Sequence, residues 1–133
     1  MKKVFVNGTF DILHLGHMEL ISTASNSGDY LMLAIDSDRR VSEKKGPQRP
    51  IHDQNTRSNM LMYIKGVNEV KIFDTDEDLI NIVKEYEPDI MIVGSDYRNA
   101  KVIGSEYAKQ LNFFERIEEY SSTKIIKNIV NRR

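Results

Sequence analysis

Two histidines stand three residues apart near the N-terminus, in the segment "NGTFDILHLGH" at residues 7–17. The chain has only three histidines, so His14 and His17 place most of its imidazole chemistry in one short segment. Side chains at positions i and i+3 of a helix are neighbours, with Cβ atoms about 5–6 Å apart. A helix that begins here would also offer unpaired backbone N–H groups and a positive dipole to an anion. The spacing therefore favours a phosphate-binding site.

This segment differs from the common glycine-rich phosphate loops, because neither G-x-G-x-x-G nor G-x-x-x-x-G-K-[ST] occurs in the chain. Gly8 would let the backbone approach a ligand closely, and Gly16 omits a side chain that would crowd it. Two other interpretations stay open. A single histidine near a helix start is more often structural, and two histidines with Asp11 as the only nearby third ligand make a weak metal site.

Composition excludes several classes of protein. The 133 residues carry a net charge of −1, which gives no overall field toward nucleic acid or anionic membranes. There is no cysteine, so disulfides and cysteine-built zinc sites are excluded. No apolar stretch approaches the ~20 residues of a membrane span. We expect one domain over residues 1–133, located in the cytoplasm, without nucleic acid or a membrane as a partner.

Apolar runs alternate with segments of helical period along the chain, which predicts an α/β fold with a five-stranded, mainly parallel sheet flanked by helices. The expected strands are residues 3–8, 30–36, 69–74, 89–94 and 113–117. The expected helices are residues 16–28, 53–66, 76–88, 105–111 and 121–133, with Asp53 as the N-cap of the second.

Ligands of such sheets bind beyond the carboxyl ends of the strands. This rule gathers residues 7–17, 36–50, 94–98 and 117–123 along one edge of the molecule. Residues 39–57 are expected to form a basic loop there, although a solvated surface loop explains most of its charges equally well. Asp96 follows the fourth strand, and the hydroxyl residues at 121–123 could cap the last helix or help it to bind an anion.

The segment "GTFDILHLGH" resembles the signature of the cytidylyltransferase-like nucleotidyltransferases, in which H-x-G-H binds and activates a nucleoside triphosphate. The resemblance covers nearly the whole chain, through "GDYLMLAIDSD", "KKGPQRPI", "TR" at 56–57, "VGSDY" and "SSTKII". Two groups of this family fit best. "KKGPQRP" and "GSDYRNAKVIGSEY" are similar to the adenylyltransferase domain of ADP-heptose synthase, which we rank first. Residues 1–38, through "MKKV", "GTFDILHLGH" and "GDYLMLAIDSD", and Arg116 are similar to glycerol-3-phosphate cytidylyltransferase.

This resemblance implies a Rossmann-like domain that transfers a nucleoside monophosphate from ATP or CTP to a phosphorylated small molecule and releases pyrophosphate. The first expectation is a heptose 1-phosphate-like sugar phosphate with ATP, and the alternative is glycerol 3-phosphate with CTP. The acceptor phosphate would attack the α-phosphorus directly, so catalysis needs positioning and charge stabilisation rather than a protein nucleophile. The resemblance also implies Mg²⁺ held mainly by phosphate oxygens, with Asp11 as the one protein candidate, and a homodimer.

The resemblance carries site roles onto matching positions of this chain. The expected catalytic residues are His14, His17, Lys44 and Arg57, and Asp38 and Lys45 are expected to bind the acceptor. The expected nucleotide-binding residues are Gly8, Thr9, Phe10, Asp11, Gly16, Asp96, Arg116, Ser121, Ser122 and Thr123.

The chain departs from the family pattern before its last helix. Glu119, preceded by Glu118, replaces a glycine, and Ser122 replaces a threonine but keeps the hydroxyl. A carboxylate at residue 119 would place negative charge near the triphosphate unless it turns outward. The rival interpretation is therefore a nucleotide-binding regulator that has lost catalysis.

Overall fold

A computed structural model describes residues 1–94, 100–115 and 121–132, and shows a five-stranded sheet of order β3-β2-β1-β4-β5 in which every pairing is parallel. The strands are β1 (Lys3–Gly8), β2 (Tyr30–Asp36), β3 (Glu69–Phe73), β4 (Ile90–Gly94) and β5 (Gln110–Phe114). The predicted α/β fold with a parallel sheet is confirmed. Asp96, Arg116, Glu118 and Glu119 lie outside the described residues.

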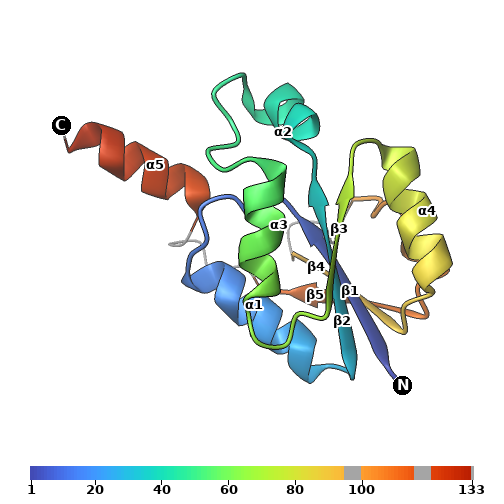
Figure 1. Ribbon diagram of the computed structural model, residues 1–133. Coiled ribbons are helices and arrows are strands. Elements are labelled where there is room, and N and C mark those ends of the chain that lie inside the picture. Colours follow the sequence, from blue (N-terminus) through green and yellow to red (C-terminus); the bar gives the residue numbers. More distant parts are fainter. Residues whose placement is uncertain (95–99, 116–120, 133) are drawn as a thin grey trace.

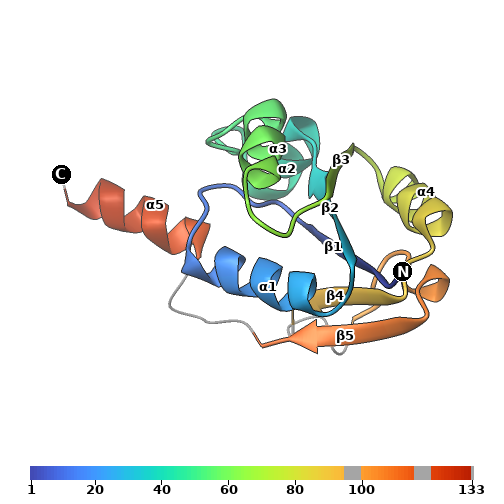
Figure 2. The same cartoon turned by 60° about the horizontal axis from the view of Figure 1, so that its bottom comes forward.

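The helices lie on both faces of the sheet (Figures 1 and 2). They are α1 (Leu15–Asn26), α2 (Asp38–Lys45), α3 (Gln54–Met62), α4 (Asp76–Tyr86) and α5 (Ser122–Asn131), with a 3₁₀ turn, η2, at Ser105–Tyr107. α1 and α3 pack against one face through Ile21, Ala24 and Leu61. α4 packs against the other face through Leu79 and Val83. Covering both faces buries nearly all of β2, as its continuous apolar run predicts.

Three segments differ from the elements expected from sequence, and one of them is α3, which ends at Met62, four residues before its predicted end. Residues 38–45 form helix α2 rather than part of a loop, because Ser37 caps the helix and Asp38 and two lysines suit the dipole at its opposite ends. Residues 105–111 contain only the turn η2 and the start of β5. Pairing of Gln110–Phe114 with β4 overrides the local helical pattern and starts the last strand three residues before the predicted position.

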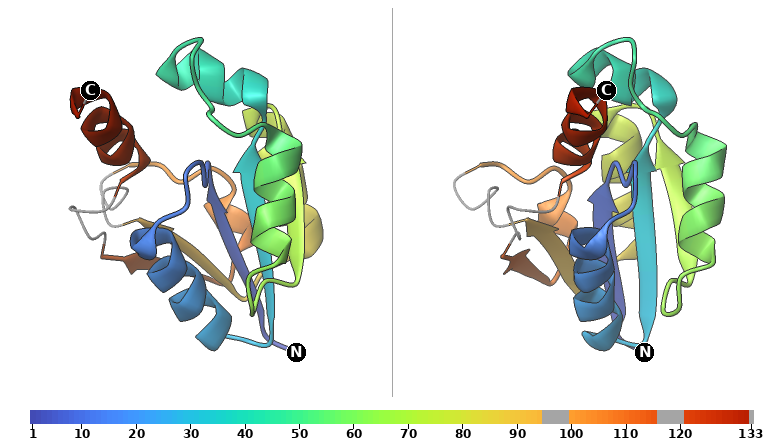
Figure 3. Two further views of the ribbon diagram at one scale, coloured as in Figure 1. Left: turned by 60° about the vertical axis from the view of Figure 1, so that its left-hand side comes forward. Right: turned by 90° about the vertical axis from the view of Figure 1, so that its left-hand side faces the viewer.

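Helix α5 projects away from the sheet and its covering helices (Figure 3). None of its residues is buried, and Ile129 keeps 61% of its surface exposed. Across the part of the chain that the structure describes, no helix combines the length and apolar character needed to cross a bilayer.

Gly66, between α3 and β3, is the site of a stability prediction. Its φ of 97° disfavours other residues, and an added Cβ would lie 2.3 Å from Ser25 Oγ. We expect Gly66→Ala to lower the free energy of unfolding by about 3 kcal/mol, through backbone strain together with overpacking. Gly46→Ala is the matched control, because Gly46 has a φ of 104° with nothing within 4 Å of an added Cβ. Gly46→Ala should lower the free energy of unfolding by about 1 kcal/mol, from strain alone. If urea denaturation gives the same loss for Gly66→Ala, overpacking against Ser25 is contradicted.

Candidate active site

The two histidines build the start of α1. His14 is the N-cap, and its Nδ1 accepts a hydrogen bond from the backbone N–H of Gly16 at 3.1 Å. His17 Nδ1 accepts from the backbone N–H of His14 at 3.2 Å, which completes a reciprocal capping box. The i, i+3 spacing therefore has a structural purpose as well as a chemical one.

This capping arrangement fixes the protons of both imidazoles. A nitrogen that accepts a hydrogen bond carries no proton, so each neutral ring carries its proton on Nε2. The rings stack with centroids 3.8 Å apart at an interplanar angle of 27°, so the expectation that they lie together is confirmed. The result is a pair of neighbouring N–H donors beside a helix N-terminus, an arrangement suited to phosphate oxygens.

The loop between β1 and α1 has two strained residues, Phe10 at φ 53° and Ile12 at φ 55°. Such left-handed conformations are uncommon outside glycine and concentrate at functional sites. The buried Phe10 ring lies against His17 with centroids 5.2 Å apart. A Cβ on Gly8 would approach this ring to 3.0 Å, so Gly8 makes room for Phe10. The sequence gives no sign of this strain.

Asp11, expected to bind the nucleotide and to be the one protein candidate for Mg²⁺, anchors the loop that precedes α3. Its carboxylate accepts hydrogen bonds from the backbone N–H groups of Ile51 at 2.7 Å and His52 at 3.0 Å. The residue is 2% exposed. Both oxygens therefore accept from the loop that precedes α3 rather than from the histidines. Among the described residues, no group of three or more His, Cys, Asp or Glu gathers as a metal site.

Arg57, expected to be a catalytic residue, lies inside the molecule with its side chain fully buried. Its guanidinium donates to the carbonyl oxygens of Thr9, Asp36 and His52 at 2.9–3.0 Å. It also donates to the carboxylate of Asp38 at 2.9 Å, which engages the residue expected to bind the acceptor. Arg57 thus ties the β1–α1 loop to the carboxyl end of β2 and the start of α2.

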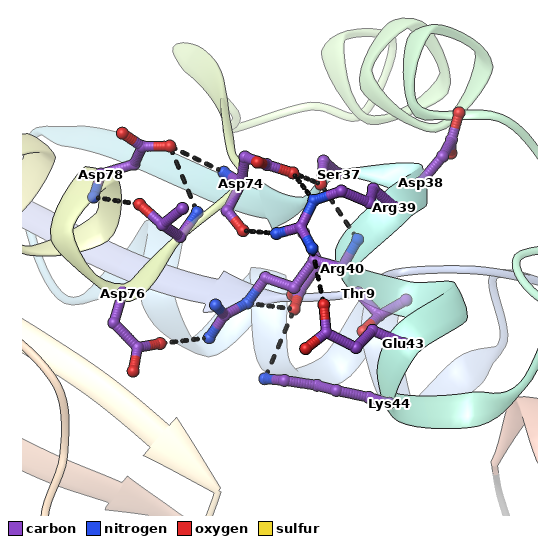
Figure 4. A network of polar contacts seen from close by, with 12 residues as sticks. Thr9, Ser37, Asp38, Arg39, Arg40, Glu43, Lys44, Asp74, Asp76 and Asp78 are labelled. Atoms are coloured by element: carbon purple, nitrogen blue, oxygen red, sulfur yellow. Dashed lines mark hydrogen bonds and ion pairs between the residues drawn. The ribbon is translucent and has the colours of Figure 1, made fainter.

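Lys44 lies in the last turn of α2, and a polar network fixes this helix to the start of α4 (Figure 4). Arg40 spans the two elements, with Nε 3.1 Å from Asp36 and Nη2 2.7 Å from Asp76. Lys44 Nζ lies 3.8 Å from the same Asp36 carboxylate and remains half exposed. A weak, exposed ion pair costs little to exchange for another anion, so Lys44 is the more available of the two cations on Asp36.

Acid should loosen this network at Asp74. Hydrogen bonds from Arg39 and Ser37 hold the pKa of the Asp74 carboxyl below its usual range. A carboxyl whose pKa is lowered by folding contributes stability above its unfolded pKa of about 4, and this is lost as pH falls through the folded value. We expect urea denaturation to show a smaller loss of stability from pH 5 to pH 3 for Asp74→Asn than for the unaltered chain. Equal losses would contradict the assignment.

The N-terminus of α5 is fastened to the β1–α1 loop. Ser121 is the N-cap, and its Oγ accepts from Lys124 N–H at 3.0 Å. The Ser122 hydroxyl donates to the backbone oxygens of Asp11 and Ile12. Both hydroxyls are therefore engaged within the protein, so an anion at this helix end would meet the backbone N–H groups of residues such as Thr123.

The site thus unites the starts of α1 and α5 at the carboxyl edge of the sheet (Figure 3), with Lys44 on α2. The sequence profile described as "Cytidylyltransferase-like" matches residues 5–128 of this chain. The chain belongs to the cytidylyltransferase-like family. The resemblance found in the H-x-G-H segment is therefore confirmed over nearly the full sequence.

Relatives with this domain are longer proteins. "Bifunctional protein HldE" of Campylobacter fetus subsp. fetus (strain 82-40) is 42% identical over 126 residues, which cover 95% of this chain and 27% of the relative. The protein of the same name from Helicobacter pylori (strain Shi470) is 40% identical over 128 residues, which cover 96% of this chain and 27% of the relative. This chain therefore spans about a quarter of the length of these relatives.

A solved structure shows the same fold. The lipopolysaccharide core biosynthesis protein from Thermoplasma volcanium GSS1 superposes with a TM-score of 0.70 at 25% identity, covering 88% of this chain and 99% of that protein. This agreement supports the Rossmann-like architecture of this family member.

Proposed function

We propose that this chain is a nucleotidyltransferase that moves a nucleoside monophosphate from a nucleoside triphosphate to a phosphorylated small molecule. The observation that carries the proposal is the stacked pair of imidazoles, His14 and His17, whose Nδ1 atoms accept backbone hydrogen bonds at the start of α1. The chain's likeness to "Bifunctional protein HldE", together with its resemblance to the adenylyltransferase domain of ADP-heptose synthase, favours ATP and a heptose 1-phosphate-like acceptor.

In the proposed reaction, an oxygen of the acceptor phosphate attacks the α-phosphorus as the bond to the β-phosphate breaks and pyrophosphate leaves. His14 and His17 donate hydrogen bonds to phosphate oxygens whose charge changes in this step. Lys44 exchanges its contact with Asp36 for the triphosphate and neutralises part of its charge. Mg²⁺, held by phosphate oxygens and water, would add charge neutralisation.

Pyrophosphate release is the experiment that tests this proposal. ATP and CTP are each combined, with Mg²⁺, with heptose 1-phosphate and with glycerol 3-phosphate. We expect turnover with ATP and heptose 1-phosphate. Turnover only with CTP and glycerol 3-phosphate would instead identify a glycerol-3-phosphate cytidylyltransferase, the alternative activity. No turnover in all four mixtures, with a nucleotide still raising the melting temperature, would favour the regulator that has lost catalysis.

A homodimer is part of the same proposal, carried by the family resemblance. The exposed apolar side chains of α5, among them Ile129 and Val130, are compatible with an interface. Sedimentation equilibrium measures the mass directly, and a monomer at micromolar concentration would remove this part of the proposal without affecting the reaction.

A further inference from the structure

Arg49 lies in the loop between α2 and α3, with its backbone held on both sides. Its N–H donates to Gly46 O at 3.1 Å, and its own carbonyl accepts a hydrogen bond from the Ser42 hydroxyl. Its side chain is 13% exposed, so the guanidinium lies mostly beneath the surface. In the sequence, Arg49 is one of several basic residues of the segment 39–57, with nothing that sets it apart from its neighbours.

The guanidinium of Arg49 lacks partners that its burial requires. Within the described residues, it is the side chain whose buried polar atoms, Nε and Nη2, make no hydrogen bond. The nearby Asp11 carboxylate lies 3.7 Å from Nε, which is an ion-pair distance but not a hydrogen bond. Asp11 already accepts from two backbone N–H groups, so turning it toward Arg49 would leave those donors unpaired.

The contrast with Arg57 shows that this is a local feature of the site. Arg57 is also buried next to the β1–α1 loop, and it donates to four oxygens. Arg57 therefore serves the fold, whereas Arg49 retains unused donors. An unpaired buried donor costs about 1–3 kcal/mol, and more when it is charged. An arginine kept in this state is explained by an acceptor that arrives from outside.

The position of Arg49 indicates the chemistry of that acceptor. Asp11 belongs to the loop that leads into His14, and its carbonyl accepts from Ser122 at the start of α5. Arg49 therefore stands beside the junction of the two helix N-termini of the candidate site. A guanidinium presents a planar fork of donors that matches two oxygens of one phosphate group.

We propose that Arg49 binds a phosphate oxyanion of the substrates, either in the nucleoside triphosphate or in the phosphorylated acceptor. This inference rests on the proposed function for the identity of its ligands. The oxyanion would supply the hydrogen bonds that Asp11 does not make. With 13% of its surface exposed, the Arg49 side chain can be reached from solvent.

Isothermal titration calorimetry of the full chain with ATP, heptose 1-phosphate and inorganic phosphate tests this inference without requiring turnover. We expect Arg49→Gln to weaken binding of at least one of the first two by about 10- to 100-fold, the range for hydrogen bonds to a charged group. Weakening of ATP alone assigns Arg49 to the triphosphate, and weakening of heptose 1-phosphate alone assigns it to the acceptor. Arg49→Lys keeps the charge but loses the planar fork of donors, so its affinity should lie between those of the unaltered chain and of Arg49→Gln.

Two controls separate this role from a structural one. Arg132→Gln changes an exposed arginine at the end of α5 and should leave all affinities unchanged. Arg49→Gln should leave the unfolding midpoint in urea nearly unchanged, because it removes buried donors that make no hydrogen bond but also removes the 3.7 Å ion pair with Asp11. Unchanged affinities for ATP and heptose 1-phosphate in both Arg49 variants would overturn the inference, as would failure of the unaltered chain to bind any of the three probes. Normal phosphate binding through Arg49 without turnover would overturn only the proposed function.

Discussion

His17→Gln is expected to lower kcat/KM for pyrophosphate release by about 10²- to 10³-fold, the cost of removing one donor aimed at developing charge. Glutamine at this third helical position can still reach back to the N-cap backbone, as in an ordinary capping box. The variant should therefore unfold at the same urea concentration as the unaltered chain. His14→Asn follows the same logic, because asparagine is among the best N-cap residues. Both variants separate phosphate chemistry from helix capping.

His52→Gln is the matched control for these substitutions. His52 holds Asp11 through its backbone N–H and Arg57 through its carbonyl, so those contacts survive a change of side chain. Its turnover should stay within about twofold of the unaltered chain, a free-energy difference below 1 kcal/mol. Turnover of His17→Gln within threefold of normal would contradict the proposed role of the imidazole pair, whatever the control shows.

The sequence predicts the frame of this molecule well because its strands have strong and simple patterns. The apolar runs that form β1, β2, β3 and β4 lie within a residue or so of their predicted bounds. The Asp53 N-cap is confirmed, with its side chain accepting from Thr56 N–H at 2.7 Å. Residues 38–45 were harder to predict, because charged residues dominate α2 and only Val41 is buried. Its stability depends on caps and on contacts with the start of α4.

The candidate site is predicted in its position but less well in its internal contacts. Spacing alone brings His14 and His17 together, since their proximity is local in the chain. Several partners of Asp11 and Arg57 are distant in the chain: Asp11 accepts from Ile51 and His52, and Arg57 donates to Thr9, each 40 or more residues away. Residue type cannot show whether an arginine points to solvent or to the carbonyl groups of distant loops. This is why the sequence leads us to expect a catalytic Arg57, whereas in the structure Arg57 donates to carbonyl groups of three separate segments.

Arg57→Ala is expected to lower the free energy of unfolding by about 3–5 kcal/mol, the cost of removing one partner of a buried charged network. The substitution removes the guanidinium donor from the carbonyl groups of Thr9, Asp36 and His52, and removes the ion-pair partner of the Asp38 carboxylate. Arg57→Lys should recover only part of this loss, because an ammonium has three donors on a flexible stem and cannot span the same acceptors. Urea denaturation with a fluorescence or circular dichroism readout measures both variants.

The same two variants decide whether Arg57 positions the site or touches the substrate. Arg39→Ala provides the comparison, because Arg39 pairs with Glu43 and Asp74 at the surface and should affect stability far less than the buried arginine. If Arg57 acts by tying the β1–α1 loop to β2, a stabilising osmolyte should refold Arg57→Lys and restore its turnover in parallel. Turnover that stays low after the fold has recovered would show that the guanidinium itself meets the phosphates. The tie to Thr9, Asp36 and Asp38 would then have to open during the reaction, because the fully buried side chain has no route to a ligand while those bonds hold.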